Sequence, residues 1–388
     1  MIRTPFVFIC LFLTMTSEVL LSPFYPQYFS EAFGIERIEM TSVFIICCRL
    51  VVIVMTPVWG ILLKRWAMRR VVGCSLLMTA ILKVILSEST TFSSFLTTSL
   101  LLLVFQSSLY LLYPYLVGSI EKQEEKARKT TIYIMVVHTA IIVSSLFGSV
   151  VISWEMPLKV YQLFAFMDLC LLAVLLWTKQ SFSVGPKKNT EPTPVKAVAE
   201  PIFFYMVAIF FFYLGHNAIR PYFTLFVDGR YEVSHQVNAL FYVMPSVMAI
   251  VLKLCVPIRV FSGQVIPLFY MVTILSAFTL LIQASIDSLG IFIISRILYG
   301  AGFYLSMVVL DIYLFRQSQE AATYYYSWLI AVQNVALLIA PLVALTSSKT
   351  NFYGPLLSGA VLLAVSVVAM TIRNKPLELY KQVKENEG

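Results

Sequence analysis

Charged residues are scarce in this sequence. They make up 12% of its 388 residues, about half the share found in an ordinary soluble protein. Hydrophobic residues make up 59%, and the mean hydropathy is +0.85. This composition excludes a typical soluble globular domain and predicts a membrane protein.

Metal-binding and nucleotide-binding motifs are lacking as well. The three His and six Cys have no spacing typical of a metal site, and no G-x-x-x-x-G-K-[ST] segment occurs. We therefore expect no cofactor, no metal and no ATP-driven step. The scattered His138, His216 and His235 also argue against a membrane-embedded enzyme. A non-transporting sensor would be expected to carry a soluble signalling domain, and none is recognisable.

Long apolar stretches recur along the chain. A helix of about 20 apolar residues crosses a bilayer, and we predict twelve such spans. The first six are at 4–24, 40–62, 71–89, 94–117, 131–152 and 160–177. The second six are at 201–227, 237–256, 265–283, 289–314, 324–345 and 354–372. The first stretch has no small-residue cleavage pattern after it, so we interpret it as a retained span and not as a signal peptide.

A polar segment divides these spans six and six. It runs from Thr178 to Glu200 and is rich in Pro, Lys and Thr. The predicted organisation is a six-helix bundle at 1–177, a linker at 178–200, a second six-helix bundle at 201–372 and a tail at 373–388.

The formal net charge of +8 would suggest nucleic-acid binding in a soluble protein. Here it indicates topology, because basic residues alternate between loops. Nineteen Lys and Arg fall on one side, and only Arg37, Lys159, Arg230 and Lys349 fall on the other. The positive-inside rule therefore places both termini and the linker in the cytoplasm. The absence of an N-x-[ST] sequon and the short outer loops favour a bacterial inner membrane, and we expect no nucleic-acid partner.

The loop between the second and third predicted spans carries a basic motif. It reads Gly60-Ile-Leu-Leu-Lys64-Arg65-Trp-Ala67-Met-Arg69-Arg70. This resembles the G-x-x-x-D-R-x-G-R-R loop of the major facilitator superfamily, with Lys64 in place of the Asp and Ala67 in place of the second Gly. The resemblance implies a gating loop that contains Gly60, Arg65, Arg69 and Arg70. It also implies that the state-dependent contact of the family's Asp is altered by Lys64.

Two further segments resemble the same superfamily, in particular its branch of drug and metabolite antiporters that exchange against protons. Pro23 and Pro26 resemble that branch's P-x-x-P turn after the first span. Arg296, Gly300 and Gly302 resemble its R-x-x-x-G-x-G pattern. The resemblance implies two pseudo-symmetric six-helix bundles in a monomer, with spans one, four, seven and ten lining a central cavity.

Seven charged residues inside the apolar stretches are candidates for function or pairing, because an ion there usually has a partner or faces a water-filled cavity. Glu18 and Arg49 have nearly the same depth by helical rise. They form either a functional pair, in which Glu18 carries a proton and Arg49 binds solute, or a structural ion pair. Lys83 and Asp168 lie at similar depths on predicted outer spans, and we expect a structural ion pair there.

The second half offers its own candidates. Arg220 shares a predicted helix face with His216 at i, i+4, although it could simply reach the outer surface. Pro221 predicts a kink beside it. Arg296 is a candidate for solute binding, and Asp311 either gates or only interacts with loop cations.

The predicted proton-coupling residues are Glu18 and Asp311. The predicted solute-binding residues are Arg49, Arg220, Arg296, Gln106, Tyr110, His216, Asn217, Gln333 and Asn334. For the aromatic and amide members of this set, packing between helices is the competing interpretation.

The sequence thus predicts an all-α secondary transporter with twelve transmembrane helices and the major facilitator fold. The excess of Arg over acid on cavity-side spans favours an anionic or zwitterionic organic solute, which could be siderophore-like or drug-like. We expect proton-coupled export by alternating access, with small solutes, protons and membrane lipids as partners. The alternative is a proton-coupled uptake symporter for an organic anion.

The topology is directly testable. In a background without the six native cysteines, Lys187→Cys and Lys384→Cys should resist an impermeant maleimide added to intact cells, because both sites are predicted to be cytoplasmic. Lys349→Cys, on the predicted outer side, is the positive control. Efficient labelling at residue 187 or 384 would contradict the twelve-span arrangement.

Overall fold

The computed structural model describes residues 4–63, 65–118, 120, 123–178, 200–256, 265–317 and 322–386. Within these ranges the chain is helical and contains no strand. Twelve helical segments are long and apolar enough to cross a membrane. They begin with Thr4–Phe33 and end with Gly354–Ile372, and they confirm the predicted class of an all-α membrane protein with twelve spans.

The chain divides into two compact units. One comprises Met1–Lys188 and Val227–Ser246, and the other comprises Asn189–Phe226 and Val247–Gly388. The division therefore falls within two helices of the second half, α10 (Phe223–Tyr231) and α11 (His235–Cys255). The predicted linker lies almost entirely outside the described residues, and the predicted domain boundaries stay a prediction.

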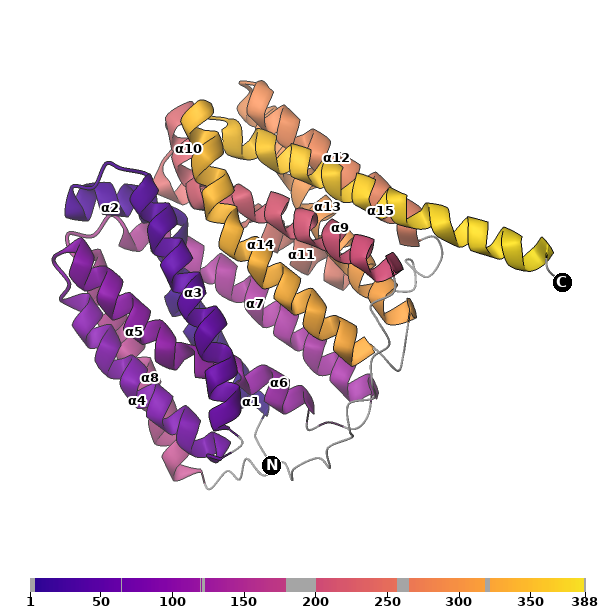
Figure 1. The fold of residues 1–388 in the computed structure, drawn as a ribbon. Coiled ribbons are helices and arrows are strands. Elements are labelled where there is room, and N and C mark those ends of the chain that lie inside the picture. Colours follow the sequence, from indigo (N-terminus) through magenta and orange to yellow (C-terminus); the bar gives the residue numbers. More distant parts are fainter. Residues whose placement is uncertain are drawn as a thin grey trace. The chain divides into compact units, whose positions relative to one another are not determined.

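Most of the first unit is built from the helices of the first six spans. These are α1 (Thr4–Val19), α2 (Tyr25–Phe33), α3 (Glu39–Leu62), α4 (Met68–Ser87), α5 (Phe92–Tyr110), α6 (Leu112–Gly118), α7 (Gln123–Val151) and α8 (Val160–Trp177). Helix α4 packs against both α5 and α8, α3 packs on α5, and α7 packs on α1 (Figure 1).

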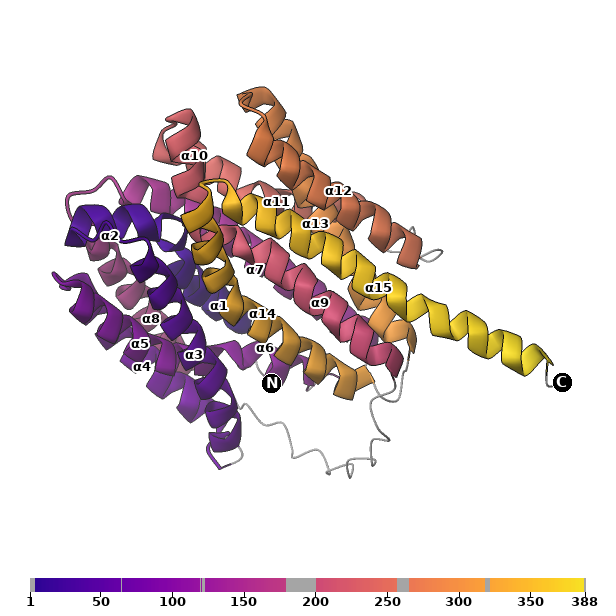
Figure 2. The same ribbon diagram turned by 45° about the horizontal axis from the view of Figure 1, so that its top comes forward.

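In the second unit, the helices are α9 (Glu200–Ala218), α12 (Val265–Ser285), α13 (Leu289–Gln317), α14 (Ala322–Thr350) and α15 (Gly354–Asn386), with parts of α10 and α11. Helix α9 packs against α14 and α15, and α12 packs against α13 and α15 (Figure 2).

Prolines break the first span. Pro23 sits in a 3-10 turn at Ser22–Phe24, and Pro26 lies in the first turn of α2, because proline lacks the backbone donor that a continuous helix needs. This break confirms the predicted turn. Gly148 of α7 packs directly on the backbone carbonyl of Leu20 just before the turn, and a Cβ at residue 148 would collide with it. Glycine is therefore required for α1 and α7 to approach this closely.

Aromatic rings pack around the outer part of the first span. The Phe29 ring lies 5.4 Å from Phe44 and 5.1 Å from Phe92, and Phe44 stacks on Phe95 at 5.3 Å. These residues belong to one buried apolar cluster or pack against it. The cluster joins α2, α3 and α5, and so fixes the end of the span that follows Glu18.

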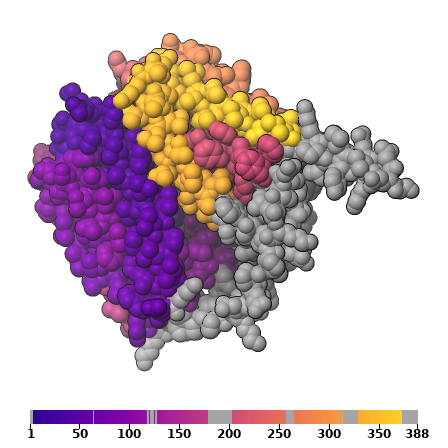
Figure 3. All heavy atoms as spheres, in the orientation of Figure 1, coloured from indigo at the N-terminus to yellow at the C-terminus, as the bar shows by residue number. Residues whose placement is uncertain are grey.

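Helix α3 carries an exposed apolar stripe. It comprises Val43, Leu50, Val54, Val58 and Ile61, which recur at the three-, four- and seven-residue spacings of one helix face. In the space-filling view, α3 forms a continuous strip on the surface of the first unit (Figure 3). An apolar stripe of this kind suits contact with hydrocarbon.

The predicted ion pair between Lys83 and Asp168 is confirmed. Nζ of Lys83 lies 2.7 Å from Oδ2 of Asp168, and both side chains are 2% exposed. The pair joins α4 to α8, and the Lys83 ammonium also lies 5.8 Å from the centre of the Phe164 ring. Each charge is therefore compensated inside the bundle.

Removing one charge should be worse than removing both. Lys83→Met should destabilise the protein by about 3–5 kcal/mol, because it leaves a buried carboxylate without its partner. Adding Asp168→Leu should restore most of that loss. The measurement is the free energy of unfolding in mixed micelles for both single variants and the double variant. Strict additivity of the two single effects would contradict a direct interaction.

Candidate functional site

The first unit contains a cavity of about 90 Å³. Its walls come from the end of α1, the turn that follows it and the start of α2, from the first half of α3, and from α5, with one residue each from α4 and α8. The polar side chains that line it are Ser17, Glu18, Ser22, Tyr25, Arg49, Ser99, Gln106 and Tyr161. The cavity therefore lies where the sequence places the proton-carrier and solute-binding candidates of the first half.

Glu18 and Arg49 both line this cavity, from α1 and α3 respectively. Each is partly buried. No hydrogen bond or ion pair joins them in the part of the chain that the structure describes, so the structural ion pair that was the competing interpretation is not formed in this conformation. A carboxylate and a guanidinium thus share a small space without neutralising each other directly.

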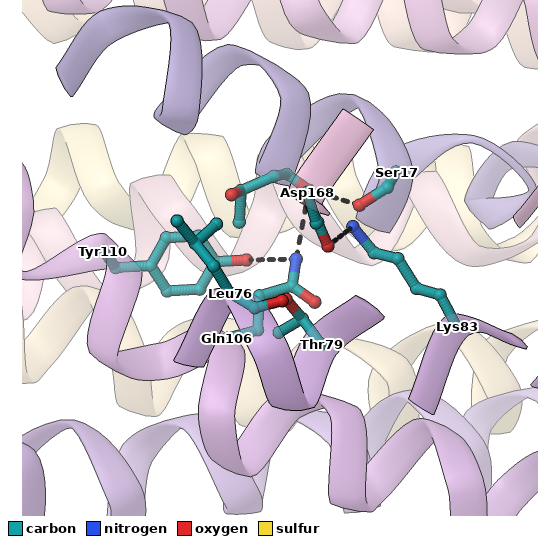
Figure 4. Close-up of polar contacts among 8 residues, drawn as sticks. Ser17, Leu76, Thr79, Lys83, Gln106, Tyr110 and Asp168 are labelled. Atoms are coloured by element: carbon teal, nitrogen blue, oxygen red, sulfur yellow. Dashed lines mark hydrogen bonds and ion pairs between the residues drawn. The ribbon is translucent and has the colours of Figure 1, made fainter. Parts of the chain in front are cut away.

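Gln106 joins α5 to α1 by a hydrogen bond, about one helical turn before Glu18 in the sequence. Its Nε2 donates to the carbonyl oxygen of Thr14 at 3.0 Å and to the hydroxyl of Tyr110 at 3.3 Å (Figure 4). The hydroxyl of Ser17 donates to the same Thr14 carbonyl at 2.9 Å. Gln106 is 2% exposed. Tyr110, which the sequence assigned to solute binding, is instead a partner of Gln106 and is not among the cavity-lining residues.

The Lys83–Asp168 pair lies in the same polar interior (Figure 4). It does not line the cavity, and its charges already satisfy each other. The described interior of the first unit therefore contains a closed pair of charges, Lys83 and Asp168, and an open pair, Glu18 and Arg49.

In the second unit, a buried cluster contains two of the predicted residues, His216 and Arg296, together with aromatic neighbours. Nδ1 of His216 is hydrogen-bonded to the hydroxyl of Tyr299 at 2.7 Å. The guanidinium of Arg296 lies 4.0 Å from the centre of the Phe223 ring and 5.0 Å from that of Tyr299. Arg296 is 5% exposed, so aromatic rings cover a cation that is almost fully buried.

Arg220 does not share this burial. Helix α9 ends at Ala218, and Arg220 opens the 3-10 turn that Pro221 imposes. This turn interrupts the helical register from which a common face with His216 was predicted. Accordingly, His216 is buried and Arg220 is exposed.

The remaining predicted residues are not gathered into one site. Asn217 donates to the carbonyl of Tyr213 in its own helix at 2.8 Å. Gln333 and Asn334 are half-buried on α14. The side chain of Asp311 lies outside the described part of the chain. A role for these residues in binding solute or protons stays a prediction.

The predicted gating loop contains one defined contact. Arg69 donates to the carbonyl oxygens of Leu175 and Leu176 at 3.0 and 3.1 Å, at the end of α8. A cation at a helix carboxyl end compensates both its unpaired carbonyls and its dipole. Arg65 and Arg70 are exposed, and open space surrounds Gly60. Lys64 is not among the described residues.

Several cavity residues escaped the sequence analysis. Ser17 could have been suspected because it precedes Glu18, whereas Cys48, Ser99 and Tyr161 carried no signal. Tyr161 lies on the sixth span, which the expected arrangement assigned to the outside of the bundle. In the structure this ring lines the cavity.

Comparison with known proteins decides the family. A family model described as Major Facilitator Superfamily matches residues 7–341. The chain belongs to the Major Facilitator Superfamily. It is therefore a multi-pass secondary transporter of a small-molecule solute and not an enzyme. No curated protein sequence matches it.

Solved structures share this major facilitator fold at low sequence identity. The human organic anion transporter MFSD10 (TETRAN) is 14% identical with a TM-score of 0.69, over 95% of this chain and 98% of that one. A bacterial homologue of the human lysosomal transporter Spinster, inward-facing and occupied, is 10% identical with a TM-score of 0.75, over 96% of each chain. Its inward-facing, unoccupied form has a TM-score of 0.67 at 10% identity, over 95% of this chain and 94% of that one.

Two variants distinguish the contribution of the Arg69 contact to stability from that of the positive charge of the loop. Arg69→Ala should lower the free energy of unfolding by about 1–2 kcal/mol, because the end of α8 loses its cationic partner. The adjacent, exposed Arg70→Ala removes the same charge and should change stability by less than about 0.5 kcal/mol. Equal effects of the two variants in mixed-micelle unfolding would show that loop charge matters and the helix-end contact does not.

Proposed function

We propose that this protein couples the movement of protons to the transport of a small organic anion or zwitterion. In this proposal Glu18 binds the proton and Arg49 binds the solute. The observation that carries it is that the two side chains face one cavity in the first unit without a direct ion pair. Asp311 is the second candidate for proton binding.

The open pair suits coupling for a physical reason. An ionised side chain in a membrane interior is unfavourable unless a partner, a proton or water compensates it. Lys83 and Asp168 compensate each other at 2.7 Å. Glu18 and Arg49 form no such direct contact, so each retains affinity for a charge that enters the cavity.

The way in which solute meets this pair decides the direction of coupling. If solute binds Glu18 directly, proton and solute compete, and exchange results. If solute binds only Arg49, it withdraws positive charge from Glu18 and favours protonation, and symport results. We propose exchange, in which solute bound at Arg49 also contacts Glu18 and competes with the proton there, and hence export by alternating access. Uptake by symport is the alternative.

The Arg49 side chain on the cavity lining favours a solute with at least one negative group. The guanidinium of Arg49 offers the forked donors that bind a carboxylate at two points. Arg296 and Arg220 add positive charge to the second unit. One solved structure of this fold is named as an organic anion transporter. Organic anions are therefore suitable first probes.

The size of the cavity limits what it holds. Pockets for drug-sized ligands occupy roughly 300–1,000 Å³, whereas this cavity measures about 90 Å³. It suits one charged head group with some water, or one end of a longer solute. Siderophore-like or drug-like solutes would therefore bind here through a terminal group.

The setting of the transporter is also part of the proposal. The distribution of Lys and Arg between loops supports both termini in the cytoplasm. The short outer loops and the absence of an N-x-[ST] sequon support a bacterial cytoplasmic membrane. The exposed apolar stripe of α3 supports contact with lipid. We propose that the functional unit is a monomer.

The role of Glu18 is tested in proteoliposomes with an imposed pH gradient, using radiolabelled organic acids and amino acids. Glu18→Gln keeps the shape of the side chain but removes its titrating proton. It should abolish gradient-driven accumulation of whichever probe the native protein accumulates, while exchange without a gradient continues.

Glu88→Gln is the matched control. Glu88 lies outside the spans, and its hydrogen bond from Lys159 lowers the pKa of its carboxyl, so this variant also removes one negative charge at neutral pH. Its gradient-driven transport should match that of the native protein. Native accumulation by Glu18→Gln would refute the proton-carrier role and direct attention to Asp311.

A further inference from the structure

The orientation of the Gln106 amide is fixed by its partners. Thr14 presents a backbone carbonyl, which can only accept a hydrogen bond, so the group that faces it at 3.0 Å is the Nε2 donor and not Oε1. Nε2 makes a second contact, to the Tyr110 hydroxyl at 3.3 Å. The common ambiguity between the two ends of a glutamine amide therefore does not arise here.

This orientation leaves the carbonyl end of Gln106 for the cavity. Gln106 is a cavity-lining residue and is 2% exposed. Its Oε1 accepts no hydrogen bond from any residue that the structure describes. A buried amide oxygen normally has a partner, so the cavity is the direction from which a donor would come.

Apart from hydroxyls, which can both donate and accept hydrogen bonds, the cavity presents two kinds of polar group. The guanidinium of Arg49 can only donate hydrogen bonds. The carboxylate of Glu18, when ionised, and Oε1 of Gln106 can only accept them. Both kinds line a space of about 90 Å³, so a small bound group meets both.

A simple anion satisfies only part of this lining. Its carboxylate would pair with Arg49 but would leave the two acceptors facing another negative group. A simple amine would satisfy the acceptors and leave Arg49 without a partner. A zwitterionic head group satisfies both, because its carboxylate meets Arg49 and its ammonium meets Glu18 and Gln106.

We infer that the cavity recognises a zwitterionic amino-carboxylate head group, and that Gln106 selects it through a hydrogen bond from the solute ammonium to Oε1. This inference deepens the proposed function and rests on Arg49 being its solute-binding residue. It narrows the solute class from organic anions in general to compounds with both charges at one end. An ammonium bound at Glu18 also competes with the proton, which favours exchange.

Matched sets of compounds test the inference directly. One set is leucine, 4-methylpentanoate and isoamylamine, and a second is phenylalanine, 3-phenylpropanoate and phenethylamine. Each keeps one skeleton and removes either the amine or the carboxylate. Dissociation constants come from the rise of the thermal unfolding midpoint of the purified protein with ligand concentration.

The amino acid of at least one set should bind at least about tenfold more tightly than both of its partners, because each partner loses a charge-assisted hydrogen bond. Carboxylates that bind as tightly as their amino acids would overturn the inference. So would the absence of binding by both amino acids.

Variants at residue 106 test the role of the amide. Gln106→Met should weaken binding of the preferred amino acid by about tenfold and leave binding of its carboxylate partner unchanged. Gln283→Met, at a buried glutamine on α12 of the second unit, is the control for losing a buried amide and should change neither constant.

A conservative variant covers the case in which Gln106→Met does not fold. In Gln106→Glu, a protonated carboxyl at residue 106 can still donate to the Thr14 carbonyl and present its carbonyl oxygen to the cavity. This variant should therefore keep the preference for the amino acid. A preference that shifts to the carboxylate partner in Gln106→Glu would overturn the inference.

These results are separate from those that test coupling. Equilibrium binding in detergent needs no gradient, whereas the coupling test measures gradient-driven accumulation by Glu18→Gln. Amino-acid binding without gradient-driven transport would refute the proposed coupling and keep the recognition of a zwitterion. Gradient-driven transport of carboxylates alone, with no preference for amino acids, would support the proposed coupling and refute the recognition of a zwitterion.

Discussion

The free energy of a charge in a membrane interior is the constraint on which this structure depends. A bilayer core offers no water to an ion or to a backbone group, so each must be satisfied by the protein. Lys83 and Asp168 meet the constraint by pairing at 2.7 Å with 2% exposure. Glu18 and Arg49, a similar acid and base in the same unit, share a cavity without pairing. The charges of Lys83 and Asp168 compensate each other, whereas Glu18 and Arg49 gain a direct partner only when a proton or solute enters the cavity.

Packing around α1 keeps Glu18 from forming a direct ion pair with Arg49. The Thr14 carbonyl accepts from both Ser17 and Gln106, so α1 and α5 are held together about one turn before Glu18. Two residues after Glu18, the Leu20 backbone lies against Gly148, and the proline turn follows. Because α1 is fixed on both sides of Glu18, its carboxylate is not free to move with the helix toward Arg49. The positions of these charges are therefore set by backbone packing and not by their mutual attraction.

The sequence predicted the parts of this arrangement that depend on position along a helix axis. Twelve spans follow from hydropathy, and the Lys83–Asp168 pair follows from equal depth. It did not predict the parts that depend on rotation about the axis. Several spans are apolar on every side, so no hydrophobic face indicates which side is inward. This is why Tyr161, which lines the cavity, lay on a span predicted to be an outer one. Gln106 was found from sequence, but which end of its amide meets the cavity required the carbonyl of Thr14.

The second unit shows an intermediate solution to the same constraint. Rings of Phe223 and Tyr299 cover the Arg296 guanidinium, and such contacts stabilise a desolvated cation by about 2 kcal/mol without cancelling its charge. Charges in this protein thus range from paired, at Lys83 and Asp168, through ring-covered, at Arg296, to open, at Glu18 and Arg49. A solute or proton can exchange rapidly only with groups that need not first lose a protein partner. For this physical reason Glu18 and Arg49 are better candidates than Arg296 for binding proton and solute during transport, although the sequence offered all three as candidates.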